Sequence, residues 1–293
     1  MNSTPKRFGM EEKLREQKIV RILTILLALL VARLAMVNRG NEEKAVYGEG
    51  NVEQQEMQEE EQKEMGMSIT DAYPLLYATQ PVQMEHNTEE KTVFLTFDDG
   101  PSRNTEKVLD LLQQYNIKAT FFVIGMNLTE DGILCLKRAV EEGHVIGLHT
   151  ETHDYKQLYS SLAGFLSDYH KLSERLLDVL GQCPALFRFP GGSYNMYAKE
   201  TKEEIVEEME RRGFVYYDWN VSGEDSVGTP TAYSIKSNIF PAVYEQKQPV
   251  ILLHDSAATS LTVDVLPFII EELQKAGYTF DTLDHREPCQ FSW

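Results

Sequence analysis

From residue 91 onward, short apolar runs alternate with longer amphipathic segments. The runs are rich in Val, Ile, Leu and Phe, as buried strands are, and they cover 92–97, 119–124, 145–148, 186–189, 214–219, 250–253 and 278–280. The segments between them have helical spacing, and several end at a glycine; they cover 104–115, 134–142, 162–180, 199–212, 231–244 and 263–276. This alternation predicts a parallel α/β domain, either a barrel or a doubly wound sheet.

The pattern near the start of the chain is different. A basic tail, residues 1–21, precedes an apolar segment at 22–37. With its flanks the segment approaches the roughly 20 residues that cross a bilayer, and Arg21 and Arg33 can snorkel at its ends. We expect a cytoplasmic tail and a single transmembrane anchor, with the rest of the chain outside the cytoplasm. A cleaved signal peptide and a buried helix are the alternatives, but no small-x-small cleavage site follows Val37.

The formal net charge of −18 argues against nucleic-acid binding, because that function requires a basic face. Much of the excess negative charge lies between Glu42 and Glu64, in a Glu- and Gln-rich stretch. Such a stretch has little to bury and is typical of a solvated spacer. We therefore expect a spacer over residues 38–90 and a domain over residues 91–293 that folds and functions without it.

The three cysteines, Cys135, Cys183 and Cys289, form no CxxC pair. Their spacing argues against a zinc ribbon or a thioredoxin-type site. An odd number allows at most one disulfide, and the sequence leaves open whether Cys183 and Cys289 form it.

Charged or metal-binding side chains occur at five of the predicted strand ends. They are Asp98 and Asp99, His149 and His153, Arg188, Asp225, and His254. In both architectures the carboxyl ends of parallel strands meet at one edge, where catalytic groups collect. The coincidence therefore predicts one site built from all five strand ends.

Each residue has a simpler interpretation when it is taken alone. Asp98 and Asp99 precede Gly-Pro and are compatible with an ordinary turn. A pair four residues apart, such as His149 and His153, can be a solvated helix face. Together, two histidines and one carboxylate form a facial metal-binding set with open coordination positions. The second carboxylate would then be free to act as a base.

Arg188 and His254 are interpreted in the same way. Arg188 alone is compatible with a surface cation, but beside two carboxylates it is better explained as the partner of Asp98. A single histidine such as His254 is ordinarily a core residue, yet Asp225 supplies an orienting carboxylate. An Asp–His pair of this kind serves general acid catalysis.

These motifs, in this order, resemble those of the polysaccharide deacetylase family, also known as the NodB-homology domain or carbohydrate esterase family 4. The resemblance covers roughly residues 91–283, in the motifs at 96–100, 149–153, 188–192, 219–225 and 252–254. It implies a distorted, incomplete (β/α) barrel. One position departs from the pattern, because the fourth motif often has Trp after the Asp, and this chain has Ser226.

The resemblance also implies a divalent metal ion, commonly zinc, with Co²⁺, Mn²⁺ and Ni²⁺ as alternatives. By this resemblance the metal ligands are Asp99, His149 and His153. The metal would polarise the amide carbonyl and acidify the attacking water.

The remaining roles implied by the resemblance concern proton transfer. Asp98 is the general base, held by Arg188, and His254 is the general acid, tuned by Asp225. A backbone N–H near Gly191 would help to hold the oxyanion.

The substrate contacts implied by the resemblance come from Pro190, Gly191, Gly192, Trp219 and Leu252. The two glycines would let a sugar ring approach the backbone closely. Leu252, completed by Trp219 or a loop residue, would line the pocket for the acetyl methyl group.

The implied activity is metal-dependent removal of N-acetyl groups from a cell-wall polysaccharide, with peptidoglycan as the first choice. The expected partners are this polysaccharide and, through the anchor, the lipid bilayer; we expect a monomer. Poly-N-acetylglucosamine, chitin oligomers and acetyl xylan are alternative substrates. An iron oxygenase also uses two histidines and a carboxylate, but it leaves Asp98 and the Asp225–His254 pair without a role. A non-catalytic wall-binding protein is the third alternative, although no catalytic residue is missing.

Overall fold

The computed structural model describes residue 69 and residues 71–79, 91–246 and 248–291. Within these residues no helix has both the length and the apolar character that crossing a membrane requires. The expected tail, the expected anchor at 22–37 and most of the expected spacer lie outside the described residues, so these stay predictions.

Eight strands form one sheet in which every pairing is parallel. They are β1 (Thr92–Gly100), β2 (Thr120–Ile124), β3 (Val145–Thr150), β4 (Leu186–Phe187), β5 (Val215–Tyr216), β6 (Val221–Ser222), β7 (Val250–His254) and β8 (Thr279–Phe280). Their order is β5-β4-β3-β2-β1-β7-β6, and β8 pairs with the start of β1. The predicted parallel α/β architecture is therefore confirmed.

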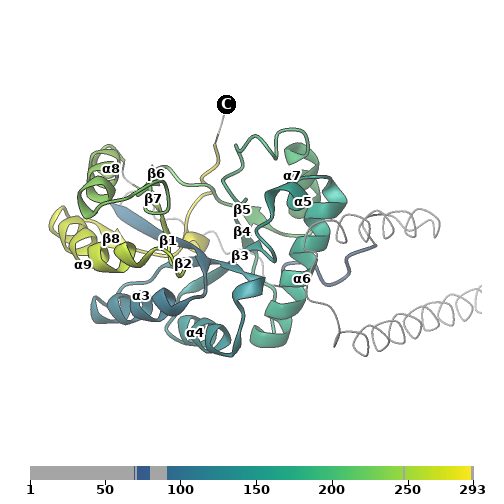
Figure 1. The fold of residues 1–293 in the computed structure, drawn as a ribbon, viewed down its shortest axis with the longest axis horizontal. Coiled ribbons are helices and arrows are strands. Elements are labelled where there is room, and N and C mark those ends of the chain that lie inside the picture. Colours follow the sequence, from purple (N-terminus) through teal and green to yellow (C-terminus); the bar gives the residue numbers. More distant parts are fainter. Residues whose placement is uncertain (1–68, 70, 80–90, 247, 292–293) are drawn as a thin grey trace, which may run out of the picture. The chain divides into compact units, whose positions relative to one another are not determined.

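Helices surround the sheet (Figure 1). They are α3 (Arg103–Gln114), α4 (Glu130–Glu141), α5 (Tyr155–Leu158), α6 (Leu162–Leu180), α7 (Lys202–Arg211), α8 (Ala232–Tyr244) and α9 (Ser260–Lys275), with 3-10 turns η1 (Gly125–Asn127) and η2 (Leu283–His285). Side-chain caps begin several of them, as at Ser102 before α3 and Thr129 before α4, because a hydroxyl satisfies a free backbone N–H there. Helix α6 ends at Gly181 in the left-handed conformation, at φ 72°.

The sheet is curled into an incomplete barrel. Strands β5 and β6 lie at opposite ends of the strand order, yet only residues 217–220 join them. An extended chain spans at most about 3.6 Å per residue, so the two edges of the sheet must lie close together. The run predicted as one strand at 214–219 forms only the short strand β5, and β6 is a separate strand that follows this crossing. Asp225 consequently follows β6 and not the strand from which it was predicted to extend.

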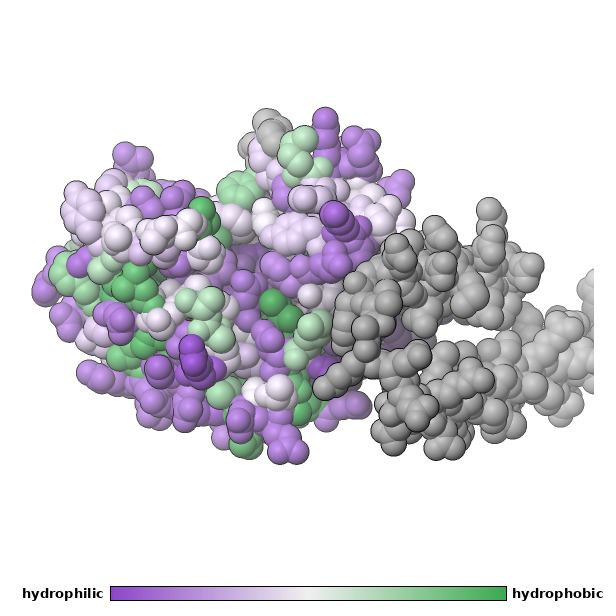
Figure 2. Space-filling model, in the orientation of Figure 1, coloured by the Kyte–Doolittle hydropathy of each residue, from purple (hydrophilic) through white to green (hydrophobic). Residues whose placement is uncertain are grey.

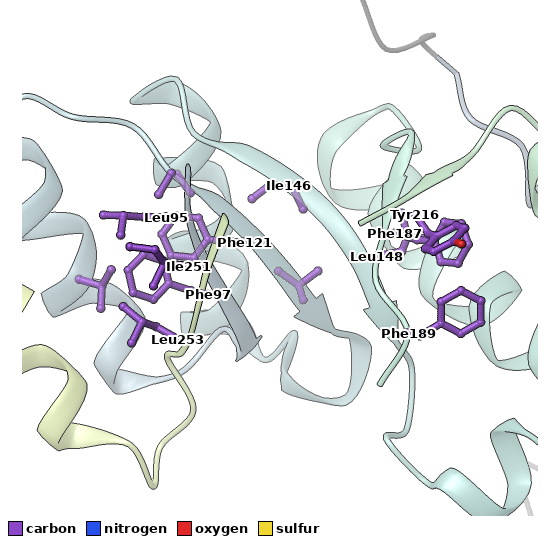
Figure 3. Packing of buried hydrophobic residues seen from close by; sticks show 14 of the residues in the cluster. Leu95, Phe97, Phe121, Ile146, Leu148, Phe187, Phe189, Tyr216, Ile251 and Leu253 are labelled. Atoms are coloured by element: carbon purple, nitrogen blue, oxygen red, sulfur yellow. The ribbon is translucent and has the colours of Figure 1, made fainter. Parts of the chain in front are cut away.

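Side chains alternate between the two faces of the sheet, as they must in strands. Leu95, Phe97, Phe121, Ile251 and Leu253 belong to the main core with the helices, and Figure 3 shows them packed together. The opposite face holds a second, smaller core made of Phe94, Phe122, Leu186, Tyr217, Val250 and Leu283. This alternation places the chemistry-bearing residues at the carboxyl end of the second face.

The outer surface is expected to be polar, because these apolar side chains lie in the core. The face seen in Figure 2 is mainly hydrophilic, and its apolar residues form small, separate areas. The three cysteines are free thiols, so Cys183 and Cys289 form no disulfide in this structure.

Residues 71–79 pack against the domain, although they belong to the stretch predicted as a spacer. Leu76 is fully buried, and Tyr73 is nearly so. The buried guanidinium of Arg212 donates to the carbonyls of Tyr73 (2.8 Å) and Leu76 (3.1 Å) and pairs with Glu208 at 2.8 Å. The domain therefore starts upstream of the predicted boundary at residue 91, because this apolar and hydrogen-bonded segment completes its core.

Candidate active site

The two adjacent carboxylates at the end of β1 point to different partners. Asp98 lies opposite His254 in the register between β1 and β7, and it is buried. Asp99 has a left-handed backbone, at φ 72°, where the pairing of β1 with β2 is irregular. This turn of the backbone directs the Asp99 carboxylate toward the histidines that follow β3.

Asp99, His149 and His153 come together as a possible metal site. The Asp99 Oδ1 atom lies 3.5 Å from Nε2 of His149 and 3.3 Å from Nε2 of His153. One ligand atom from each residue falls within 4.8 Å of the other two. Asp99 Oδ1 is buried and accepts no hydrogen bond from the described residues, and a buried carboxylate oxygen of this kind needs a partner.

The protonation of these residues suits a cation. Burial by itself would raise the pKa of Asp99, but the neighbouring His149 and then the charge of His153 lower it to about 2. Burial, followed by the charge of His149, lowers the pKa of His153. A carboxylate and a neutral imidazole are forms that bind divalent metals, so the shifts of Asp99 and His153 fit such an ion.

Hydrogen bonds from neighbouring residues orient the two histidines. His149 directs Nδ1 to the carbonyl oxygen of Arg188 at 3.0 Å, which leaves Nε2 facing Asp99. The buried carboxylate of Asp168, on α6, accepts hydrogen bonds from Thr150 Oγ1 (2.6 Å), Glu151 N (2.6 Å) and Thr152 Oγ1 (2.7 Å). Asp168 thus fixes the loop between the two histidines, and contacts of this type set ligand geometry.

Sequence reasoning missed Asp168, although a signal was present. It lies on the apolar stripe of α6, one turn from the buried residues Phe165 and Leu172. A charge at such a position has to be paired.

Arg188 is fully buried and makes four hydrogen bonds. Nη1 donates to Asp98 Oδ1 (2.8 Å) and Thr96 Oγ1 (2.7 Å), Nε donates to the Tyr217 carbonyl (2.8 Å), and Nη2 donates to the Asp218 carbonyl (3.1 Å). The guanidinium also lies over the ring of Phe122, 4.2 Å from its centroid. These contacts join the carboxyl end of β1 to the segment that crosses between the two sheet edges.

His254 and Asp225 form a closely held pair. Nδ1 of His254 lies 2.8 Å from Asp225 Oδ1, and the His254 backbone N–H donates to Oδ2 at 2.8 Å. Thr262 Oγ1 also donates to Oδ2. Burial opposes the charge on His254, but the hydrogen bond and charge of Asp225 raise its pKa to about 9. His254 is therefore an imidazolium at neutral pH, with its Nε2 proton directed away from Asp225.

Ser226 lies beside this proton. Its Oγ is 3.3 Å from His254 Nε2, and the side chain is exposed. A small hydroxyl thus contacts the candidate acid at the position where the related motif often carries Trp.

The predicted substrate residues have structural tasks that sequence reasoning did not foresee. Gly191 and Gly192 have φ values of 75° and 80°. A Cβ at Gly191 would lie 2.9 Å from the Tyr155 hydroxyl, and one at Gly192 would lie 2.9 Å from the Trp219 ring. The glycines therefore make room for two aromatic rings of the protein itself, and their close approach to a sugar stays a prediction.

The other three predicted substrate residues frame this loop and the strand beside it. The Pro190 carbonyl accepts from the Tyr159 hydroxyl at 2.8 Å. Trp219 is half-buried against Phe291, with ring centroids 5.2 Å apart. Leu252 lies two residues before His254 on β7 and is almost fully buried.

Two further buried aspartates border the site. Asp218 accepts from Ser193 N (2.8 Å), Ser193 Oγ (2.6 Å) and Phe291 N (2.9 Å), and so ties the loop after β4 to the end of the chain. Asp255 follows His254 and accepts from Thr105 Oγ1. Burial, together with the charges of Asp99 and Asp98, raises the pKa of Asp255 to about 7.

Comparison with known proteins gives consistent matches. The family model described as polysaccharide deacetylase matches residues 85–214. The chain is 34% identical over 213 residues to the putative polysaccharide deacetylase YheN of Bacillus subtilis, which covers 69% of this chain and 71% of that protein. It is 35% identical over 212 residues to a peptidoglycan-N-acetylglucosamine deacetylase of Bacillus cereus, which covers 71% of this chain and 93% of that protein.

A solved structure shows the same similarity. The catalytic domain of peptidoglycan N-acetylglucosamine deacetylase from Eubacterium rectale superposes with a TM-score of 0.65 at 31% identity, over 72% of this chain and 96% of that one.

Proposed function

Because this chain belongs to the polysaccharide deacetylase family and is a hydrolase of amide bonds in an N-acetylated polysaccharide, we propose that its substrate is peptidoglycan, at N-acetylglucosamine or N-acetylmuramic acid residues. One observation supports the mechanism. The buried carboxylate of Asp98 and the imidazolium of His254 lie beside the candidate metal ligands Asp99, His149 and His153. The relatives named as peptidoglycan-N-acetylglucosamine deacetylases support the choice of polymer. An iron oxygenase is set aside, because the family is one of hydrolases.

We propose that Asp99, His149 and His153 hold a divalent metal ion, with zinc as the first choice and Co²⁺, Mn²⁺ or Ni²⁺ as alternatives. The buried Oδ1 of Asp99, which accepts no hydrogen bond from the residues that the structure describes, supports this proposal. When bound, such an ion polarises the amide carbonyl and lowers the pKa of a bound water molecule.

Asp98 acts as the general base in this proposal. Its Oδ1 is occupied by Arg188, whereas Oδ2 lies 4.0 Å from His149 Nε2, on the side of the ligand set. Oδ2 is therefore placed to accept a proton from the attacking water. Arg188 holds the carboxylate in one orientation and supports its charge before the reaction starts.

His254 acts as the general acid. Collapse of the tetrahedral intermediate expels an amine, which must receive a proton to become a good leaving group. The imidazolium of His254, held by Asp225, carries that proton on Nε2. The base and the acid thus occupy paired positions on neighbouring strands, β1 and β7.

The test of the substrate is direct. Peptidoglycan fragments are incubated with the metal-loaded protein and analysed by mass spectrometry, with the Asp98→Asn variant as the control. Loss of acetyl groups from the sugars, absent in the variant, is the expected result. Acetate release from acetylated xylan, poly-N-acetylglucosamine or chitin oligomers but not from peptidoglycan would assign a different polymer.

We further propose that the domain acts outside the cytoplasm, anchored through residues 22–37. The basic residues before that apolar segment support this orientation. Protease added to intact, wall-stripped cells should remove the domain. Full protection of the domain would show the opposite orientation, and release into the medium would favour a cleaved signal peptide.

A further inference from the structure

Two aromatic rings extend outward from the ligand set: Tyr155 at the start of α5, and Tyr197 in the loop that follows β4. The His153 ring lies in edge contact with Tyr155, with ring centroids 5.2 Å apart. Tyr155 in turn contacts Tyr197, at 5.5 Å. We refer to Tyr155 and Tyr197 as the aromatic platform. Its outer member, Tyr197, is 56% exposed.

Exposure alone does not indicate a binding site, because single apolar side chains are common on protein surfaces. The support beneath Tyr197 is more informative. Asn195 Nδ2 donates to the carbonyls of Pro190 (3.1 Å) and Gly192 (2.7 Å), and Asn195 Oδ1 accepts from Ala198 N (2.9 Å). Ala198, next to Tyr197, is fully buried. The loop is therefore fixed on both sides of an outward-facing tyrosine.

The inner member of the platform is fixed in the same region. The Tyr155 ring fits against Gly191, where a Cβ would lie 2.9 Å from its hydroxyl. It also contacts Tyr159, at 6.0 Å, and the Tyr159 hydroxyl donates to the Pro190 carbonyl. The platform is thus preorganised beside the reaction centre, and preorganised groups bind with a smaller loss of entropy.

We propose that the aromatic platform binds the sugar residue next to the one that is deacetylated, so that the enzyme prefers a glycan chain to a single sugar. This inference rests on the proposed function. A sugar ring presents a face of C–H groups, which packs on the electron-rich face of an aromatic ring. Tyrosine provides such a face at low conformational cost, and its hydroxyl can bond to sugar hydroxyls.

The spacing agrees with this assignment. Tyr155 adjoins the ligand His153, whereas Tyr197 lies one ring contact further out. The ring centroids of Tyr155 and Tyr197 are 5.5 Å apart, so Tyr197 lies beyond the residues that contact the ligand set. A chain whose N-acetyl group lies at the ligand set would therefore place its neighbouring sugar over Tyr197.

The experiment compares kcat/KM for a tetrasaccharide and for a single N-acetylated sugar of the same polymer. In Tyr197→Ala, the tetrasaccharide-to-monosaccharide ratio should fall roughly tenfold, equivalent to about 1.4 kcal/mol. Tyr197→Phe should keep most of the ratio, because it retains the ring. Tyr244→Ala is the matched control, since Tyr244 at the end of α8 is 54% exposed but belongs to no part of the site. It should leave the ratio unchanged.

Several outcomes would overturn the inference. One is equal kcat/KM for both substrates in the wild type, and another is an unchanged ratio in a Tyr197→Ala variant that retains metal. If Tyr197→Ala folds poorly, tetrasaccharide affinity is measured by calorimetry in Asp98→Asn, with and without Tyr197→Phe and Tyr197→Leu. Leucine should weaken binding and phenylalanine should not, and equal binding by both would refute the platform. No acetate release by the wild type from any glycan would instead refute the proposed function.

Discussion

At the scale of single residues, the end of β1 separates two chemically identical groups by backbone conformation. Asp98 stays in the strand and meets the guanidinium of Arg188. Asp99 adopts a left-handed conformation and faces His149 and His153. A left-handed backbone is uncommon for residues other than glycine, although Asp tolerates it better than most. This turn makes one carboxylate a candidate ligand and the other a candidate base.

Substitutions of the two aspartates should therefore have different effects. Asp99→Asn should weaken metal binding, because an amide oxygen is a poorer ligand than a carboxylate, and excess metal should partly restore activity. Asp98→Asn should keep its metal and lose roughly 100- to 10,000-fold in kcat, without rescue by metal. Elemental analysis beside kcat at several metal concentrations measures both. A metal-free Asp98→Asn beside a loaded Asp99→Asn would mean that the two roles are exchanged.

The Asp225–His254 pair predicts the alkaline side of the pH profile. The acid must be protonated to act, and the pKa of His254 is raised to about 9. Activity should therefore persist at pH values below about 9 and fall as the pH rises through it. Asp225→Asn removes the charge that raises this pKa, so the fall in kcat/KM should move to lower pH. Thr262→Ala, which removes only a neighbouring hydrogen bond to Asp225, should move it less. An unchanged profile in Asp225→Asn would remove His254 from the role of acid.

At the scale of elements, the site is assembled because parallel strands end at one edge of the sheet. The long strands and helices could be predicted from their apolar spacing, and the strand-end residues could be predicted to converge. Strand β6 was not predicted and β5 is shorter than predicted, because two-residue strands carry no periodicity of their own. Asp168 could have been found as a charge on the apolar stripe of α6, whereas Asp218 could not, because its partners lie in distant loops.

Helix α6 provides a test of how an element supports the site. Asp168→Asn should loosen the loop between His149 and His153 and lower metal affinity or activity by roughly 10- to 100-fold. Asp178→Asn, on the exposed side of the same helix, is the matched control and should have no effect on either quantity. Metal titration of both variants gives the comparison. Equal affinity in the two variants would show that the loop keeps its shape without Asp168.

At the scale of the whole molecule, the packed segment 71–79 is expected to stabilise the domain. Leu76→Ala should lower the free energy of unfolding by about 2–5 kcal/mol, because it leaves a cavity in the core. Leu75→Ala, at an exposed neighbouring position, should change it little. A chain that starts at residue 91 should unfold more easily than one that starts at residue 69, because Arg212 loses buried acceptors. Denaturant unfolding of the two variants and the two truncated chains measures these differences in stability. Equal stability of the two truncated chains would contradict the role of residues 71–79.

The short crossing between the two edges of the sheet links catalysis to folding. The carbonyls of Tyr217 and Asp218 hold the guanidinium that orients Asp98. The proposed base, Asp98, is therefore in position only after the first and last parts of the barrel have met. A partly folded chain in which the two edges of the sheet are still apart would be inactive, although every proposed catalytic residue is present. Recovery of activity during refolding should then coincide with the last step of assembly and lag behind the formation of secondary structure.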